Sequence, residues 1–201
     1  MDVSGCGRVA SPDFSGASKA SAWAREIEGS SLRDEVLATI ATTLGESDPI
    51  AAGTLAIQTL PPGKVQADAV VGIIQRWAQN DPKAAAAWVG QFPEGALRNA
   101  AVENIAKLWA DKDARPAGEW LNSLRPGESR NNAIRAYSEQ IAPFSPRQAA
   151  IWAGTITDSQ MRIAQLETIA KVWMEADSVA AKAWLSQMPF SQESRSRILK
   201  R

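Results

Sequence analysis

The stretch "NDPKAAAAW", Asn80–Trp88, combines an Asp-Pro step, four alanines and a tryptophan in nine residues. An Asp-Pro step is typical of a helix start, because the carboxylate accepts free N–H groups and Pro at the first helical position loses no hydrogen bond. Alanine is the best helix former and its small side chain lets another helix approach closely. Tryptophan supplies a large apolar surface, about 150–250 Å². We therefore predict a short helix in which Trp88 fills the gap that the alanines leave.

The same pattern returns along the chain in "KDARPAGEW", "SPRQAAIW" and "DSVAAKAW". One register of equivalent positions, with steps of 33, 32, 32 and 32, contains Leu55, Trp88, Trp120, Trp152 and Trp184, and extends back by 32 to Trp23. A second register contains Leu44, Trp77, Trp109, Ile141 and Trp173. A third register contains the helix-start residues Asp48, Asp81, Asp113, Ser145 and Asp177. All eight tryptophans thus share one period, and a period in this range indicates stacked structural units.

Each unit of about 32 residues is predicted to hold two helices. The first, helix A, carries an apolar stripe at helical spacing, as in Leu97, Ala101, Ile105, Leu108 and Trp109. Equivalent stripes are Val65, Ala69, Ile73 and Trp77, and Leu32, Val36, Ile40 and Leu44. The second, helix B, starts at the Asp-Pro step and ends in turns rich in Pro and Gly. Helices are predicted at 17–27, 31–45, 48–59, 64–79, 81–91, 96–110, 114–123, 128–141, 146–154, 159–175, 178–187 and 191–200.

The predicted fold class is all-α, a right-handed α-solenoid of helix-hairpin repeats with roughly twelve helices. Residues 1–15 are predicted to be a flexible N-terminal tether, and residues 16–201 a single helical-repeat domain. We interpret the tryptophans as core residues that join successive units, because they occupy the apolar stripe at a fixed period. The alternative interpretation is that exposed rings stack on sugars or proline-rich peptides.

A further register places a cation in the first turn of helix A, at Arg33, Arg98, Arg130 and Arg162, with Gln66 as the exception. A cation there opposes the helix dipole, so another interaction must favour it. We predict a hydrogen bond to the aspartate cap or to carbonyls at the end of the neighbouring helix B. The alternative is a ladder of guanidinium groups that binds an acidic partner.

Composition argues against several functions. The formal net charge is zero, which disfavours nucleic acid as a partner. The chain has no histidine and a single cysteine, so Ser-His and Cys-His arrangements and Cys-rich metal sites are absent from it. The acid pairs Glu26 with Glu28 and Asp111 with Asp113 carry no mark of catalysis. We predict no catalytic residue, metal or cofactor, no apolar run long enough to span a bilayer, and a solvated helix end for the basic segment "SRSRILKR".

The N-terminal "VSGC", Val3–Cys6, resembles the lipobox of bacterial lipoproteins, in which the cysteine becomes lipidated. Cys6 is therefore a lipidation candidate. Only Met1 and Asp2 precede the motif, and they do not supply the apolar segment of a signal peptide. Two interpretations stay open. Either the chain begins within an envelope or periplasmic lipoprotein, anchored by lipid at this end, or it is a cytoplasmic chain with one cysteine near its start.

From about residue 17 onward, the paired helices resemble the helical-repeat superfamily that includes tetratricopeptide and HEAT repeats. The tetratricopeptide motif itself is missing, since "ENIAKLWADKDARP" places Trp109 at the end of its helix. The pattern is most similar to the Trp- and Asp-Pro-containing repeats of large bacterial envelope proteins. The resemblance implies a non-enzymatic scaffold that binds a protein or peptide partner. The alternatives are a structural spacer without a specific ligand, and a carboxylate-dependent enzyme on an α/α scaffold.

Overall fold

The computed structural model describes residues 14–199, which contain twelve helices and no strand. The helices are α1 (Phe14–Arg25), α2 (Ser30–Leu44), α3 (Pro49–Thr59), α4 (Lys64–Asn80), α5 (Pro82–Val89), α6 (Ala96–Lys112), α7 (Ala114–Ser123), α8 (Glu128–Ile141), α9 (Pro146–Gly154), α10 (Ser159–Ala176), α11 (Ser178–Gln187) and α12 (Gln192–Leu199). The all-α class and the number of helices are confirmed for this part of the chain. The largest boundary difference is three residues, at the start of α1.

The chain divides into two compact units at Ile73 and Ile74, inside α4. The sequence predicts a single repeat domain over 16–201, so the division is an addition that the periodicity does not reveal. Most of the predicted tether, residues 1–13, lies outside the described residues, and residues 14 and 15 belong to α1. Each unit is described by itself below.

In the first unit, α2 packs against both α1 and α3. The core contains small residues, such as Ala41, Ala52 and Ala56, around the fully buried Leu37. At the beginning of α4, the Gln66 side chain donates hydrogen bonds to the backbone carbonyls of Ile57 and Leu60. The alanines allow close helix contact, as the sequence predicts.

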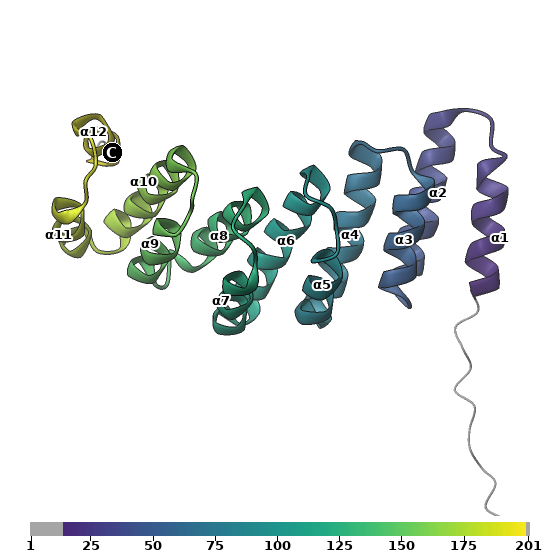
Figure 1. Cartoon of the computed structure of the whole chain (residues 1–201), viewed down its shortest axis with the longest axis horizontal. Coiled ribbons are helices and arrows are strands. Elements are labelled where there is room, and N and C mark those ends of the chain that lie inside the picture. Colours follow the sequence, from purple (N-terminus) through teal and green to yellow (C-terminus); the bar gives the residue numbers. More distant parts are fainter. Residues whose placement is uncertain (1–13, 200–201) are drawn as a thin grey trace, which may run out of the picture. The chain divides into compact units, whose positions relative to one another are not determined.

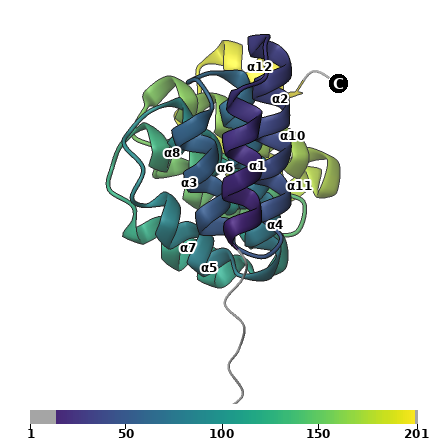
Figure 2. The same cartoon turned by 90° about the vertical axis from the view of Figure 1, so that its right-hand side faces the viewer.

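In the second unit, the A-type helices form one layer in which α6 packs on α8, α8 on α10, and α10 on α12. The B-type helices α7 and α9 each contact the A-type helix before and the one after, for example α7 with α6 and α8. Figure 1 shows this succession from teal to yellow, and Figure 2 shows α5 and α7 on the same side of this unit. Ile105, Ile134 and Ile169, one from each of three successive A helices, are fully buried between them.

Helix starts follow the predicted cap register at four of its five positions. The side chains of Asp48, Asp81, Asp113 and Asp177 accept backbone N–H groups from the first turn of α3, α5, α7 and α11. Ser145 stands at the same position before α9, but its side chain makes no cap hydrogen bond. The predicted structural role of the aspartates is therefore confirmed, and the predicted cap at Ser145 is wrong.

The buried stripe of helix A is shifted from the predicted one. In α6 it contains Arg98, Ala101, Val102, Ile105, Ala106 and Trp109. Leu32 and Val65, predicted to begin the stripes of α2 and α4, are 56% and 40% exposed. In α4 and α6 the next residue, Gln66 or Arg98, donates to carbonyls at the end of the preceding B helix and takes the buried place. Arg33 of α2 is instead partly exposed and lies against Asp34.

Polar pairs join successive A helices along the second unit. Arg135 of α8 lies 2.7 Å from the Glu103 carboxylate of α6, and Arg197 of α12 lies 2.7 Å from the Glu167 carboxylate of α10. Gln140 of α8 also donates a hydrogen bond of 2.9 Å to Asp111 of α6. The A-type helices are thus held together by polar contacts along their partly exposed edge as well as by their buried isoleucines.

The Glu167–Arg197 pair gives stability a defined pH dependence. Hydrogen bonding from Arg197 holds the pKa of the Glu167 carboxyl below its ordinary value of 4.5. Because the folded-state pKa is the lower one, this stabilisation is fully present above about pH 4.5 and is lost as the pH falls through the folded-state value. We expect Glu167→Gln to lower the free energy of unfolding at pH 7, and this difference to shrink in acid, as measured by urea unfolding followed by circular dichroism.

Glu193→Gln is the matched control. Its carboxylate lies 2.9 Å from the same Arg197 but its side chain is 81% exposed, against 12% for Glu167. Exposed ion pairs contribute little, so the control should change stability much less. Equal effects of the two substitutions, or a Glu167→Gln effect that does not depend on pH, would contradict the assignment.

Candidate functional site

Aromatic rings in the second unit occur in pairs, one from the end of helix A and one from the following helix B. The ring centroids are 5.9 Å apart for Trp77–Trp88, 5.8 Å for Trp109–Trp120 and 5.5 Å for Trp173–Trp184. Pairs at such separations stabilise beyond the area they bury. The rings therefore hold the two helices of one hairpin together, a contact within the unit that the sequence interpretation did not specify.

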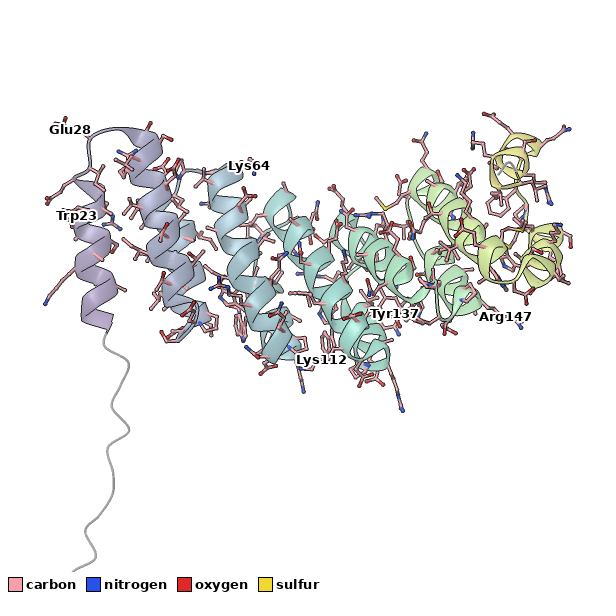
Figure 3. The ribbon with its side chains drawn as sticks, turned by 180° about the vertical axis from the view of Figure 1, so that it is seen from behind. Trp23, Glu28, Lys64, Lys112, Tyr137 and Arg147 are labelled. Carbon is pink, nitrogen blue, oxygen red and sulfur yellow. The ribbon has the colours of Figure 1, made fainter. Side chains whose placement is uncertain are left out.

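The tryptophans differ in how far they are buried: two are buried, five are half-buried and Trp23 is exposed. Trp109 and Trp173, at the ends of A helices, are each 8% exposed. Trp88, Trp120, Trp152 and Trp184, on B helices, are half-buried, as is Trp77. Trp23 is 61% exposed, so its predicted core role is wrong (Figure 3). The buried face of α1 contains Ser21 and Ala24, and Trp23 lies off that face.

Tyr137 takes the ring position of helix α8, where the sequence register places Ile141. Its ring lies 5.2 Å from that of Trp152, and its hydroxyl donates a 2.9 Å hydrogen bond to the Ala114 carbonyl. Burial raises the pKa of the Tyr137 hydroxyl above its ordinary value. Tyr137 precedes Ile141 by one helical turn and so presents its side chain on the same face. That spacing was the signal that could have found it.

Trp152 also reaches the preceding hairpin, as the interpretation of the tryptophans predicts. A Cβ atom placed on Gly118 of α7 would lie 3.0 Å from Trp152 Cζ2 and 3.3 Å from the Tyr137 hydroxyl. These distances are too short for an unstrained contact with a packed indole. Gly118 is therefore required for the close approach of α9 to α7.

We expect Gly118→Ala to lower the free energy of unfolding by at least ~1 kcal/mol, because an extra methyl group in a packed site forces its neighbours to move. Gly154→Ala, on α9, is the control, since nothing lies within 4 Å of its added Cβ. It should be neutral or slightly stabilising. Thermal and urea unfolding of both variants provide the measurement, and a Gly118→Ala protein as stable as the control would contradict the packing account.

The arginine register caps backbone carbonyls at the ends of B helices. The guanidinium groups of Arg98, Arg130 and Arg162 donate to the carbonyls of Phe92, Leu121 and Ile156, at 2.9, 3.3 and 2.6 Å. Gln66 makes the equivalent bonds in the first unit, and so its side-chain amide replaces the guanidinium. Arg33 instead lies 3.5 Å from Asp34. The carbonyl alternative is thus confirmed for these three arginines, whereas the described residues contain no bond from them to an aspartate cap.

Arg195 extends the same register, which the sequence analysis missed. Its guanidinium donates to the carbonyls of Leu185, Met188 and Phe190, at 2.8, 2.7 and 3.3 Å. The step of 33 from Arg162 could have revealed it. The prediction of a solvated basic end is therefore wrong for Arg195, whereas Arg197 is exposed as predicted and pairs with Glu167. Lys200 and Arg201 lie outside the described residues.

A groove of about 570 Å³ lies between α5 and α7. We call it the α5–α7 groove. These two helices pack on α6 rather than extensively on one another, which leaves the space open. Its apolar wall includes Ala86, Trp109 and Trp120, and its rim includes Lys83 and Arg125. Ligand sites of proteins fall in this size range and combine apolar walls with a few polar groups.

Arg98 lies at the base of this groove. Its side chain is 8% exposed, and one terminal nitrogen, Nη1, binds both the Phe92 carbonyl and the Glu94 carboxylate. Its Nε is buried and has no hydrogen-bond partner among the described residues. The Nε atoms of Arg130 and Arg195, in the same register, each donate to a carbonyl. Arg98 thus differs from these equivalents in that one donor is left unused.

A smaller groove of about 380 Å³ lies between α7 and α9 and is lined in part by Arg115, Tyr137, Gln148 and Trp152. Arg115, its counterpart of Lys83, lies 3.4 Å from Glu119 of the same helix. The charge at this groove is therefore already compensated. The α5–α7 groove is larger than the α7–α9 groove, and its Lys83 and Arg125 have no acidic partner among the described residues.

Other predicted sites are placed as follows. Asp111 accepts a hydrogen bond from Gln140, and Asp113 caps α7, so neither carboxylate of that pair stands in a closed pocket. In residues 14–199, no group of three or more acidic or cysteine side chains could hold a metal ion. None of the described helices is long and apolar enough to cross a membrane. Cys6 lies outside the described residues.

No protein-family model, no curated protein and no solved structure matches the chain.

Proposed function

We propose that the chain is a non-enzymatic helical-repeat scaffold that binds a protein or peptide partner. In this proposal its hairpins of about 32 residues stack as a right-handed α-solenoid. Two features of the second unit support the stacking: A helices that pack in succession, and ring pairs repeated at the end of each hairpin. Stacks of this kind expose extended surfaces that suit peptide binding. The assignment of binding to this architecture rests on analogy of fold.

The observation that carries the binding proposal is the α5–α7 groove, with its half-buried Trp120 beside Ala86 and the unused donor of Arg98. Apolar walls and aromatic side chains supply most of the binding energy at peptide sites, and isolated polar groups fix the orientation. We place the partner in this groove on the B-helix side of the second unit.

Selection from a random-peptide display library on the immobilised full chain tests the proposal. We expect enrichment of one family of peptides that compete with each other and bind with one-to-one stoichiometry in calorimetry. Trp120→Ser should abolish this enrichment, while Trp23→Ser, which removes an exposed ring from α1, should retain it. Failure to enrich any peptide would reject the binding function.

A structural spacer without a specific ligand is the second candidate, and the polar pairs between A helices favour it. The pairs Arg135–Glu103 and Arg197–Glu167 occur at related positions and stiffen the edge of the array. An enzyme based on carboxylates has weaker support, because Asp111, Asp113 and Glu167 all make structural contacts. The display experiment separates the spacer from the scaffold.

We further propose a cell-envelope location, with a lipid anchor on Cys6, from the "VSGC" motif and the resemblance to envelope repeats. Expression of the chain behind a bacterial lipoprotein signal segment, with metabolic labelling by a palmitate analogue, should label the protein and direct it to the membrane fraction. Cys6→Ser should lose both label and membrane association. Membrane association that survives Cys6→Ser would reject the lipid anchor at Cys6.

A further inference from the structure

We infer that the α5–α7 groove binds a peptide carboxylate that lies next to an apolar side chain, with the carboxylate above Arg98 and the apolar group against Trp120. This inference rests on the proposed function and names the chemistry of its ligand. It follows from the charge, the burial and the shape of the groove.

The charge of the groove is positive without compensation at its rim. Lys83 and Arg125 are exposed, and neither has an ion-pair partner among the described residues. The one acidic residue of the lining, Glu119, lies against Arg115. An anionic ligand is therefore favoured over a neutral or cationic one, and the attraction is strongest where water is excluded.

The base of the groove excludes water from a cation. Arg98 is buried, its Nε lacks a hydrogen bond, and its one acidic partner, the Glu94 carboxylate at 3.1 Å, is 62% exposed. Solvent therefore screens Glu94 more than it screens the guanidinium. A ligand carboxylate above Arg98 would lie next to a charge that solvent screens only weakly, and would gain a charge-assisted interaction.

The walls of the groove favour an apolar side chain next to the ligand carboxylate. Trp120 and Ala86 offer an apolar surface within the same groove. The flat indole is half-buried by its contact with Trp109, so it is held in place before a ligand arrives. An apolar side chain one or two residues from the carboxylate would cover this surface, and such preorganisation lowers the entropy cost of binding.

The carboxylate can come from a chain's C-terminus or from an Asp or Glu side chain. A random heptapeptide library is therefore screened in two formats, one with free carboxyl termini and one with amidated termini. Enrichment in the first format alone would assign the C-terminal carboxylate, and enrichment of Asp or Glu in both formats would assign the side chain. In either case the enriched peptides should carry an apolar residue next to the carboxylate and bind more weakly as salt concentration rises.

Substitution of the rim gives the decisive comparison. We expect Lys83→Ser with Arg125→Ser to weaken the enriched peptides at least tenfold, because both side chains are exposed and their loss should not affect folding. Arg147→Ser is the matched control, since Arg147 is the exposed counterpart of Lys83 on α9 (Figure 3). It should leave binding unchanged. Fluorescence anisotropy with labelled peptides measures all three.

The results of these experiments can reject the carboxylate inference separately from the proposed peptide-binding function. Peptides that are enriched without a carboxylate, or that bind the rim variant as tightly as the native chain, would overturn the inference and leave the peptide-binding function standing. A screen that enriches no peptide in either format would overturn both.

Discussion

Ile134→Ala should lower the free energy of unfolding by about 2–5 kcal/mol, because it removes buried methyl groups and leaves a cavity that the surrounding helices fill only in part. Ile134 is fully buried in α8, which packs against α6, α7, α9 and α10. The loss should therefore loosen contacts on both sides of one hairpin.

Ile163→Ala provides the control with identical chemistry. Ile163 lies on α10 and is 45% exposed, so its truncation should cost less than about 0.5 kcal/mol. Urea unfolding followed by tryptophan fluorescence measures both variants. A similar small effect at the two positions would mean that the A helices do not form the packed layer described above.

Arg98→Met should lower the free energy of unfolding by about 1.5–3 kcal/mol, the range for hydrogen bonds that involve a charged group. The substitution keeps the apolar stem of the side chain but removes the donor to the Phe92 carbonyl, which then stays buried without a partner. The same change should abolish carboxylate binding in the α5–α7 groove. Chemical unfolding and peptide anisotropy on one protein sample would report both effects.

Arg115→Met is the appropriate comparison for stability. The Arg115 side chain is 89% exposed and forms an ion pair with Glu119 on its own helix, so its loss should cost at most about 0.5 kcal/mol. If Arg98→Met proved as mild as this control, capping of the B-helix carbonyls would not be what retains an arginine at the start of helix A.

Sequence periodicity gave the helices accurately for a local reason. A helix start depends on groups three or four residues apart, such as Asp81 and the Ala84 backbone N–H, and these are adjacent in the chain. The carbonyl-capping role of the arginine register was equally accessible, because Arg98, Arg130 and Arg162 lie only six to nine residues after the carbonyls of Phe92, Leu121 and Ile156. Exposure of Trp23 was not accessible, since equivalent positions need not have equivalent neighbours.

In the candidate site, too, the residues are indicated by the sequence, but their proximity is set only by packing. Lys83, Arg98 and Trp120 each belong to a register that the sequence contains, but nothing local indicates that they line one groove. Their proximity depends on how far apart α5 and α7 lie on α6, which is a property of packing. The unpaired Nε of Arg98 likewise depends on the path of the α5–α6 turn relative to its guanidinium.

For this protein, the sequence alone determined the helices and four of their five predicted caps, because these follow from backbone hydrogen bonds and apolar spacing within one segment. The tertiary structure decided which side chains are buried, that Tyr137 supplies the ring of α8, and where cations remain without partners. These outcomes depend on distances between segments about 30 residues apart, such as the 2.7 Å between Arg135 and Glu103. Burial and charge are set by what the neighbouring hairpin presents, and a pattern read along one chain segment does not contain that information.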